Sequence, residues 1–153
     1  MSSKEDIISR AKKLRRDFAL PGQPLQETFD KIFADQHITI QYEEHGEHAK
    51  YEDGRWTITL PLNTPKVRDN FTIAHELGHI ILEHALDEDR TVHRNGNPTQ
   101  EEFEANWFAA EFLMPEDEFS CAARRCNFDE RKLAEEFEVS KAAVLVRLSV
   151  LNL

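Results

Sequence analysis

One stretch of the sequence, NFTIAHELGHIILEH from Asn70 to His84, is apolar on nearly every side when it is drawn as a helix. A helix without a polar face is typical of the centre of a domain, so this segment restricts the fold more than any other. It nevertheless carries His75, Glu76 and His79. Buried polar groups are costly unless they have partners. The sequence therefore predicts a central helix whose histidines are held by a partner, and a metal ion is the first candidate.

The spacing of His75 and His79 fits a shared metal ion. Residues four apart lie on one face of a helix, one turn from each other, so both imidazoles can reach the same point. A catalytic zinc ion normally takes three protein ligands and keeps a position for water. Glu76 lies about 100° around the helix axis from His75, and we expect it to act as a general base rather than as a ligand. The five-residue pattern alone also arises by chance, so its structural context must confirm it.

A third ligand is expected downstream, where the pattern predicts a second helix from Thr99 to about Leu113. The apolar stripe of that helix would pack against the first helix. Four glutamates on it are candidate ligands: Glu101, Glu102, Glu104 and Glu111. Glu102 also has a competing role, because Thr99-Gln100-Glu101-Glu102 fits a capping box, in which the glutamate bonds to the N-cap amide. From the residues alone, the choice of carboxylate stays open.

The rest of the chain predicts an α+β domain. Helical spacing indicates helices over residues 3–20, which Pro21-Gly22 stops, and over residues 24–36. A period of two then indicates strands, and Asp53-Gly54 between two such runs predicts a hairpin. We therefore expect a small antiparallel sheet of about three strands, with the strand at 56–60 as an edge to which a substrate adds. Residues 87–98 predict a loop, and two short helices opened by Asp129 and Ser140 follow. We expect one domain over residues 1–153.

Composition restricts the function. The chain has 29 acidic and 19 basic residues and a formal charge of −10, which opposes nonspecific binding to nucleic acid. No apolar run reaches the roughly 18 to 20 residues that span a bilayer, and the charged start is not followed by the apolar region of a signal peptide. Cys121 and Cys126 are five apart and would point to different faces of a helix, so we expect free thiols. We expect a cytoplasmic protein with no membrane partner and no direct nucleic-acid binding.

Two segments taken together, FTIAHELGHIILEH and EFEANWFAAEFLMP, resemble the ImmA/IrrE-type zinc metallopeptidases. The resemblance covers the chain from about residue 10 to the end. It implies a minimal zincin-like domain with a helical N-terminal part, a small sheet, an active-site helix, a glutamate helix and a helical tail. In this family and in related glutamate-ligand zincins, the third ligand is the glutamate of a Glu-x-x-Ala-Asn/Asp pattern. In this chain the pattern falls on residues 102–106.

The resemblance therefore implies Glu102 as the third ligand, with Glu104 as its rival. It implies that Asn106, one turn later, accepts a hydrogen bond from a ligand histidine and fixes its tautomer. Glu76 would be the general base of a zinc-dependent endopeptidase. Manganese or iron could replace zinc, because two histidines and one glutamate suit several divalent ions. Family members often cleave a DNA-binding transcriptional repressor in stress, phage or mobile-element responses, so such a repressor is the expected partner.

Several alternatives stay open. The tail from Asp129 to Leu153 has the look of a helix-turn-helix DNA-binding module, although its five acidic and four basic residues argue against one. A zinc-containing interaction protein or toxin-like partner without proteolysis is the other alternative, although a purely structural zinc site needs four protein ligands and no base. The oligomeric state is open. So is the donor that would stabilise an oxyanion, for which four residues are candidates: Tyr42, Tyr51, His84 and His93. Of these, His84 is expected to point off the ligand face and to be structural.

Overall fold

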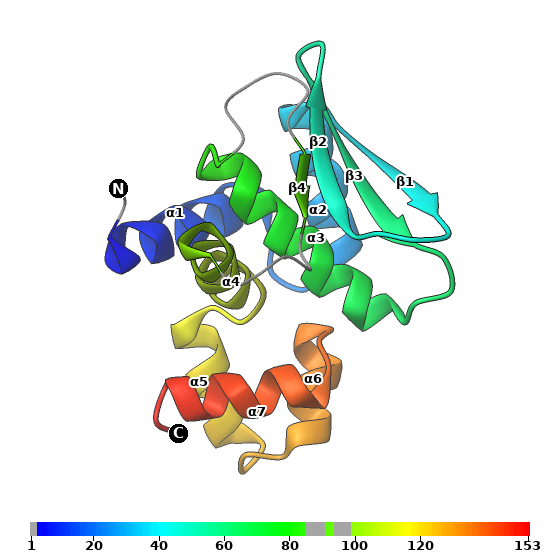
Figure 1. The fold of residues 1–153 in the computed structure, drawn as a ribbon. Helices are drawn as coiled ribbons and strands as arrows, with labels where there is room; N and C mark the ends of the chain where they lie inside the picture. The colour runs from blue at the N-terminus through cyan, green and yellow to red at the C-terminus, as the bar shows by residue number, and fades with distance from the viewer. Residues whose placement is uncertain (1–2, 85–90, 94–98) are drawn as a thin grey trace.

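The structure is a computed structural model, and it describes residues 3–84, the backbone of residues 91–93, and residues 99–153. These parts form seven helices and four strands (Figure 1). The helices are α1 (Lys4–Phe18), α2 (Leu25–Gln36), α3 (Lys66–Ile81), α4 (Gln100–Leu113), α5 (Glu116–Arg125), α6 (Glu130–Phe137) and α7 (Lys141–Val150). The strands are β1 (Ile38–Glu43), β2 (His48–Glu52), β3 (Arg55–Pro61) and β4 (Thr91–His93).

The strands form one mixed sheet in the order β1-β3-β2-β4. Asp53 and Gly54 both have positive φ, as a tight hairpin turn requires, and the predicted β2–β3 hairpin is confirmed. The prediction of an antiparallel sheet is wrong for β1, which pairs with β3 in parallel. The reason is that β3 inserts between β1 and β2, which run in opposite directions. The edge prediction for residues 56–60 is also wrong, because β3 is paired on both sides.

The segment predicted as a loop over residues 87–98 contains β4, which pairs with β2 in an antiparallel manner. The other residues of that segment lie outside the part of the chain that the structure describes. The α+β class predicted from the sequence is confirmed, with one more strand than expected.

Helix α3 is central, as its composition predicts. Between Asp69 and Ile80 every residue except Phe71 is buried. The helix packs mainly on α4, which in turn packs on α1, and it also contacts β3 (Figure 1). Apolar side chains from both helices join the main hydrophobic core, among them Ile73, Leu77, Phe108 and Phe112. Any polar group on the buried faces of α3 and α4 therefore needs a partner from within the protein or from a bound ligand.

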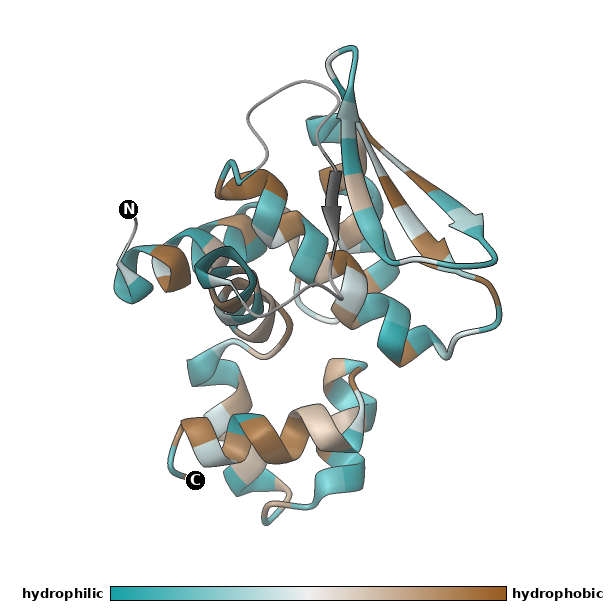
Figure 2. Cartoon of the chain, in the orientation of Figure 1, coloured by the Kyte–Doolittle hydropathy of each residue, from teal (hydrophilic) through white to brown (hydrophobic). Residues whose placement is uncertain are grey.

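The C-terminal helices form a separate layer below α3 and α4 in Figure 1. The side chains of Asp129 and Ser140 cap α6 and α7, as predicted. Figure 2 shows a strongly hydrophobic middle of α7, and Leu145, Val146 and Val150 on this helix are exposed. The exposed large side chains of α7 are thus apolar, and two of them, Val146 and Val150, line a groove. The DNA-binding alternative stays a hypothesis. Among the described residues, no helix has both the length and the apolarity needed to cross a bilayer.

A buried ion pair joins α7 to the end of α4. The Nη2 atom of Arg147 donates to Glu111 Oε1 at 2.9 Å, and its Nε donates to the carbonyl oxygen of Met114 at 3.0 Å. The other oxygen of Glu111 accepts from the backbone N–H of Glu116 at 3.1 Å. Arg147 is 6% exposed and Glu111 is 2% exposed, so water has little access to the pair.

The Arg147→Met variant is expected to lower the free energy of unfolding by about 3 kcal/mol, because it leaves the carboxylate of Glu111 buried without its cation. Urea unfolding followed by circular dichroism measures the loss. The exposed Lys141→Met change on the same helix is the control. Adding Glu111→Leu should recover most of the stability, since a buried pair can often be replaced by apolar side chains. A loss below about 1 kcal/mol, as at a solvent-exposed pair, would contradict this account.

Candidate metal centre

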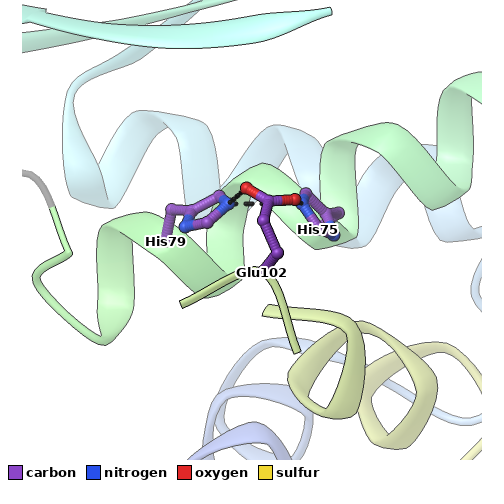
Figure 3. A group of neighbouring side chains, drawn as sticks. All are labelled: His75, His79 and Glu102. Atoms are coloured by element: carbon purple, nitrogen blue, oxygen red, sulfur yellow. Dashed lines mark hydrogen bonds and ion pairs between the residues drawn. The ribbon is translucent and has the colours of Figure 1, made fainter. Parts of the chain in front are cut away.

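Helices α3 and α4 bring His75, His79 and Glu102 together in one cluster. The two oxygens of Glu102 lie 3.0 Å from the Nε2 atoms of His75 and His79, and these Nε2 atoms are 3.2 Å apart. Figure 3 shows the carboxylate of Glu102 between the two rings. In the part of the chain that the structure describes, this is the one group of at least three such side chains with its ligand atoms close enough to share an ion. The three donors predicted from the sequence therefore meet at one point.

The close approach of the two helices depends on Gly78, which lies between the two histidines of α3. A Cβ atom at this position would lie 3.1 Å from Ala105 Cα and 3.2 Å from Ala105 O. Both are backbone atoms of α4 and cannot move without a shift of that helix. A side chain at residue 78 would therefore push α4, and with it Glu102, away from the histidines.

Asn106 orients His75. Its Oδ1 atom lies 2.8 Å from His75 Nδ1 and accepts the hydrogen bond. The Nδ1 atom then carries the proton, and the lone pair of Nε2 faces Glu102 and His79. This is the tautomer that a metal ligand needs when it binds through Nε2. The geometry agrees with the part that the resemblance implies for Asn106.

His79 is held in its neutral form. Burial is the main reason that the pKa of His79 falls to about 2, and the nearby His75 and His84 rings contribute to the same shift. His79 is 0% exposed. Only neutral imidazole offers a lone pair to a metal ion, so the surroundings of His79 fit a ligand. The donor set, the short distances and this neutral state together fit a divalent cation between the three side chains.

Glu102 has a backbone role and a side-chain role at once. The hydroxyl oxygen of Thr99 accepts a hydrogen bond from the backbone N–H of Glu102 at 3.2 Å, which caps α4. The carboxylate of Glu102 points instead to the two histidines. Thr99 thus supplies its half of the predicted capping box, and the side chain of Glu102 is placed on the histidines.

The structure corrects the expectation for His84. Helix α3 ends at Ile81, and Glu83 takes a left-handed conformation with φ of 59°. The backbone N–H of His84 donates to the carbonyl of His79 at 3.0 Å, and that of Glu83 donates to Ile80 at 3.2 Å. These bonds form a Schellman motif, which turns the chain back over the last helical turn. The Nδ1 atom of His84 lies 2.8 Å from His79 Nδ1, so the prediction that His84 points away from the ligands is wrong.

Glu104, the rival ligand, lies outside the three-residue cluster. Its Oε1 atom accepts from His84 Nε2 at 2.8 Å, and its Oε2 atom accepts from Gln100 Nε2 at 3.2 Å. The sequence did not predict that Glu104 and His79 are connected through His84. The connection depends on α3 ending before His84. A glycine at position 83 would have indicated that end, but the left-handed residue there is a glutamate.

The remaining candidates lie in different surroundings. Glu76 is 0% exposed on α3, directly after His75. Tyr42 is exposed on β1, and the ring of Tyr51 packs against Trp56 with centroids 5.2 Å apart. The side chain of His93 lies outside the described part of the chain. None of the described candidates is thereby identified as the hydrogen-bond donor to an oxyanion.

A helix with two candidate histidine ligands, a second helix with a candidate glutamate ligand and a small mixed sheet beside them are the features expected of a zincin-like metallopeptidase domain. The chain belongs to the IrrE N-terminal-like domain family, peptidase family M78, whose sequence profile matches residues 33–149. The predicted family is thereby confirmed. Membership places the chain among metallopeptidase-like proteins.

A solved structure shows the same fold. A Mycobacterium tuberculosis transcriptional regulator is similar to this chain with a TM-score of 0.71 and 20% sequence identity. The match covers 95% of this chain and 46% of that chain, so this chain spans a little under half the length of the regulator. The search of the curated proteins finds no significant match.

Proposed function

We propose that this chain is a zinc-dependent endopeptidase that hydrolyses a peptide bond in a protein substrate. The observation that carries the proposal is the convergence of His75 Nε2, His79 Nε2 and the Glu102 carboxylate within 3.0 to 3.2 Å of one another. Three donors of this kind, with no fourth ligand beside them among the described residues, match a catalytic rather than a structural zinc site. Manganese or iron suits the same donors.

Each residue has a separate role in the proposed reaction. A divalent ion held by the three ligands would lower the pKa of a bound water and polarise the carbonyl of the scissile bond. Glu76 accepts a proton from the attacking water and passes it to the nitrogen of the leaving amine. Asn106 keeps His75 in the tautomer that binds through Nε2. Hydrolysis then needs no other protein nucleophile.

A groove of about 1010 Å³ opens beside the proposed site and includes His75, Glu102 and Asn106 in its lining. It continues between α3, α4 and α7, where apolar side chains such as Phe71 and Trp107 line it. A concave apolar surface that reaches catalytic groups is the usual form of a substrate site. The groove therefore supports a substrate that presents apolar side chains next to the scissile bond.

The proposed substrate is a DNA-binding transcriptional repressor, and the proposed location is the cytoplasm, where such a repressor acts. The resemblance to the ImmA/IrrE peptidases supports this assignment. The description of the M. tuberculosis neighbour as a transcriptional regulator also connects the fold with gene control.

A cleavage assay tests the function. The purified chain, loaded with zinc, is incubated with a peptide library made from bacterial proteins and with the repressor encoded nearest its own gene. Mass spectrometry should find new internal termini that form with zinc, disappear with a chelator and return when zinc is restored. A zinc-loaded chain that produces no new termini in either substrate set would refute the peptidase proposal.

A further inference from the structure

A line of three side chains runs from α4 to His79. Glu104 on α4 contacts His84, and His84 contacts His79, each through atoms 2.8 Å apart. The side chains of Glu104 and His84 are 9% and 7% exposed, so water has little access to these bonds. The contacts lie on the Nδ1 side of His79, opposite the Nε2 atom that faces Glu102.

The donors and acceptors along this line can be assigned in sequence. The two oxygens of Glu104 accept from His84 Nε2 and from Gln100 Nε2, so the carboxylate needs an N–H on His84 Nε2. The Nδ1 atom of neutral His84 then carries a lone pair and accepts from His79 Nδ1–H. His79 is left with its lone pair on Nε2, which faces the proposed metal position.

We propose that His84 and Glu104 are positioning residues that fix the metal-binding tautomer and the ring orientation of His79. The inference deepens the proposed function, because it depends on His79 being a metal ligand. A carboxylate behind an imidazole also raises the basicity of a ligand histidine, which strengthens the metal bond. Both ligand histidines would then be oriented at Nδ1, His75 by an amide and His79 by a histidine–glutamate pair.

A purely structural role for His84 predicts a different outcome. In that case its ring fills space at the end of α3, and an apolar side chain of similar size would serve as well. Under the positioning proposal, the residue at position 84 must accept a hydrogen bond at the place of Nδ1. Asparagine can do so, since its Oδ1 atom occupies nearly the same place, but leucine cannot.

Zinc affinity distinguishes the two roles without any cleavage assay. Competition with a chromogenic chelator should show zinc bound about 10- to 100-fold more weakly by His84→Leu than by the unaltered chain. His84→Asn should recover most of the loss. The exposed His45→Leu change is the matched control and should leave the affinity unchanged. Equal affinities for the leucine variant and the unaltered chain would overturn the proposal.

The tautomer of His79 provides a second test in the metal-free Glu102→Ala chain, where no carboxylate competes for a proton on His79 Nε2. Two-bond 1H–15N correlation spectra of the imidazole rings should show His79 protonated at Nδ1 in this chain, and as a mixture or at Nε2 when Glu104→Ala or His84→Leu is added. Protonation of His79 at Nε2 in the Glu102→Ala chain would overturn the inference. Spectra can be read from any variant that keeps the native circular dichroism spectrum.

These measurements separate the two proposals. A chain that binds no zinc contradicts the proposed function, and the tautomer spectra then still decide the arrangement of His84 and Glu104. A chain that binds zinc equally well with leucine at position 84 contradicts only the role of His84.

Discussion

The Glu76→Gln variant is expected to bind zinc as the unaltered chain does and to cleave substrate about 10²- to 10⁴-fold more slowly, the usual contribution of a general acid or base. Glutamine has nearly the same size as glutamate, so the buried position in α3 stays filled. Its amide cannot accept a proton from water or pass one to the leaving amine. The proposed metal ligands on either side of residue 76, His75 and His79, are unchanged.

Two measurements check this expectation. The cleavage rate is measured on a peptide identified in the cleavage assay, and the zinc content is measured after gel filtration. Glu101→Gln is the matched control, because it makes the same chemical change on α4 next to a ligand and should keep both zinc and activity. Full activity in Glu76→Gln would remove Glu76 from the mechanism. The interaction-protein alternative would be favoured by a different pair of results. The unaltered chain would then show no detectable cleavage, and Glu76→Gln would still bind the same partner.

The Glu102→Ala variant is expected to lose zinc at stoichiometric level. Glu102 supplies the only carboxylate in the described cluster of ligand atoms. The two histidines alone form a weaker site. The zinc affinity of Glu102→Ala should therefore fall by more than the loss of about 10- to 100-fold that follows the removal of a residue hydrogen-bonded to a ligand. Cleavage should disappear together with the metal.

Glu104→Ala is the comparison for this second expectation. Glu104 is two residues away on the same helix but contacts His84 instead of the proposed ion. This variant should keep one zinc per chain and bind it more weakly. Metal analysis after dialysis against a weak chelator separates the two variants. Stoichiometric zinc in Glu102→Ala, or its complete loss only in Glu104→Ala, would show that the ligand assignment is wrong.

The helices could be predicted well because their signals are local. Apolar spacing indicated α3 and α4, and Asp129 and Ser140 indicated the starts of α6 and α7 through their capping side chains. The hairpin at Asp53-Gly54 is also a local signal. Each of these features depends on residues within about one or two turns of chain.

The arrangement of the sheet could not be predicted in the same way. The short segment between β1 and β2 suggests neighbouring strands, but β3 lies between them. Strand order depends on which surfaces pack against α2 and α3, and those contacts join distant parts of the chain. The short strand β4 was missed because three residues are too few for a period of two to be recognised.

The three side chains predicted as ligands lie close together in the structure, whereas the contacts of His84 with His79 and Glu104 were not predicted. His75 and His79 are identified by their spacing on one helix, and Glu102 follows from the family pattern. The position of His84 depends on Glu83, which adopts a left-handed conformation usually taken by glycine. Extending α3 as a regular helix places His84 on the wrong side, so its contact with His79 could be found only in three dimensions.

The close contact of α3 and α4 at Gly78 has a consequence for the stability of the molecule. The proposed ion would join two helices that only noncovalent packing holds together at this point, so its binding and their docking would be thermodynamically linked. Free zinc at 1,000 times the dissociation constant would add about 4 kcal/mol to the folding free energy. The supply of zinc would then set how long the protein resists unfolding and degradation, in addition to the rate of the proposed reaction.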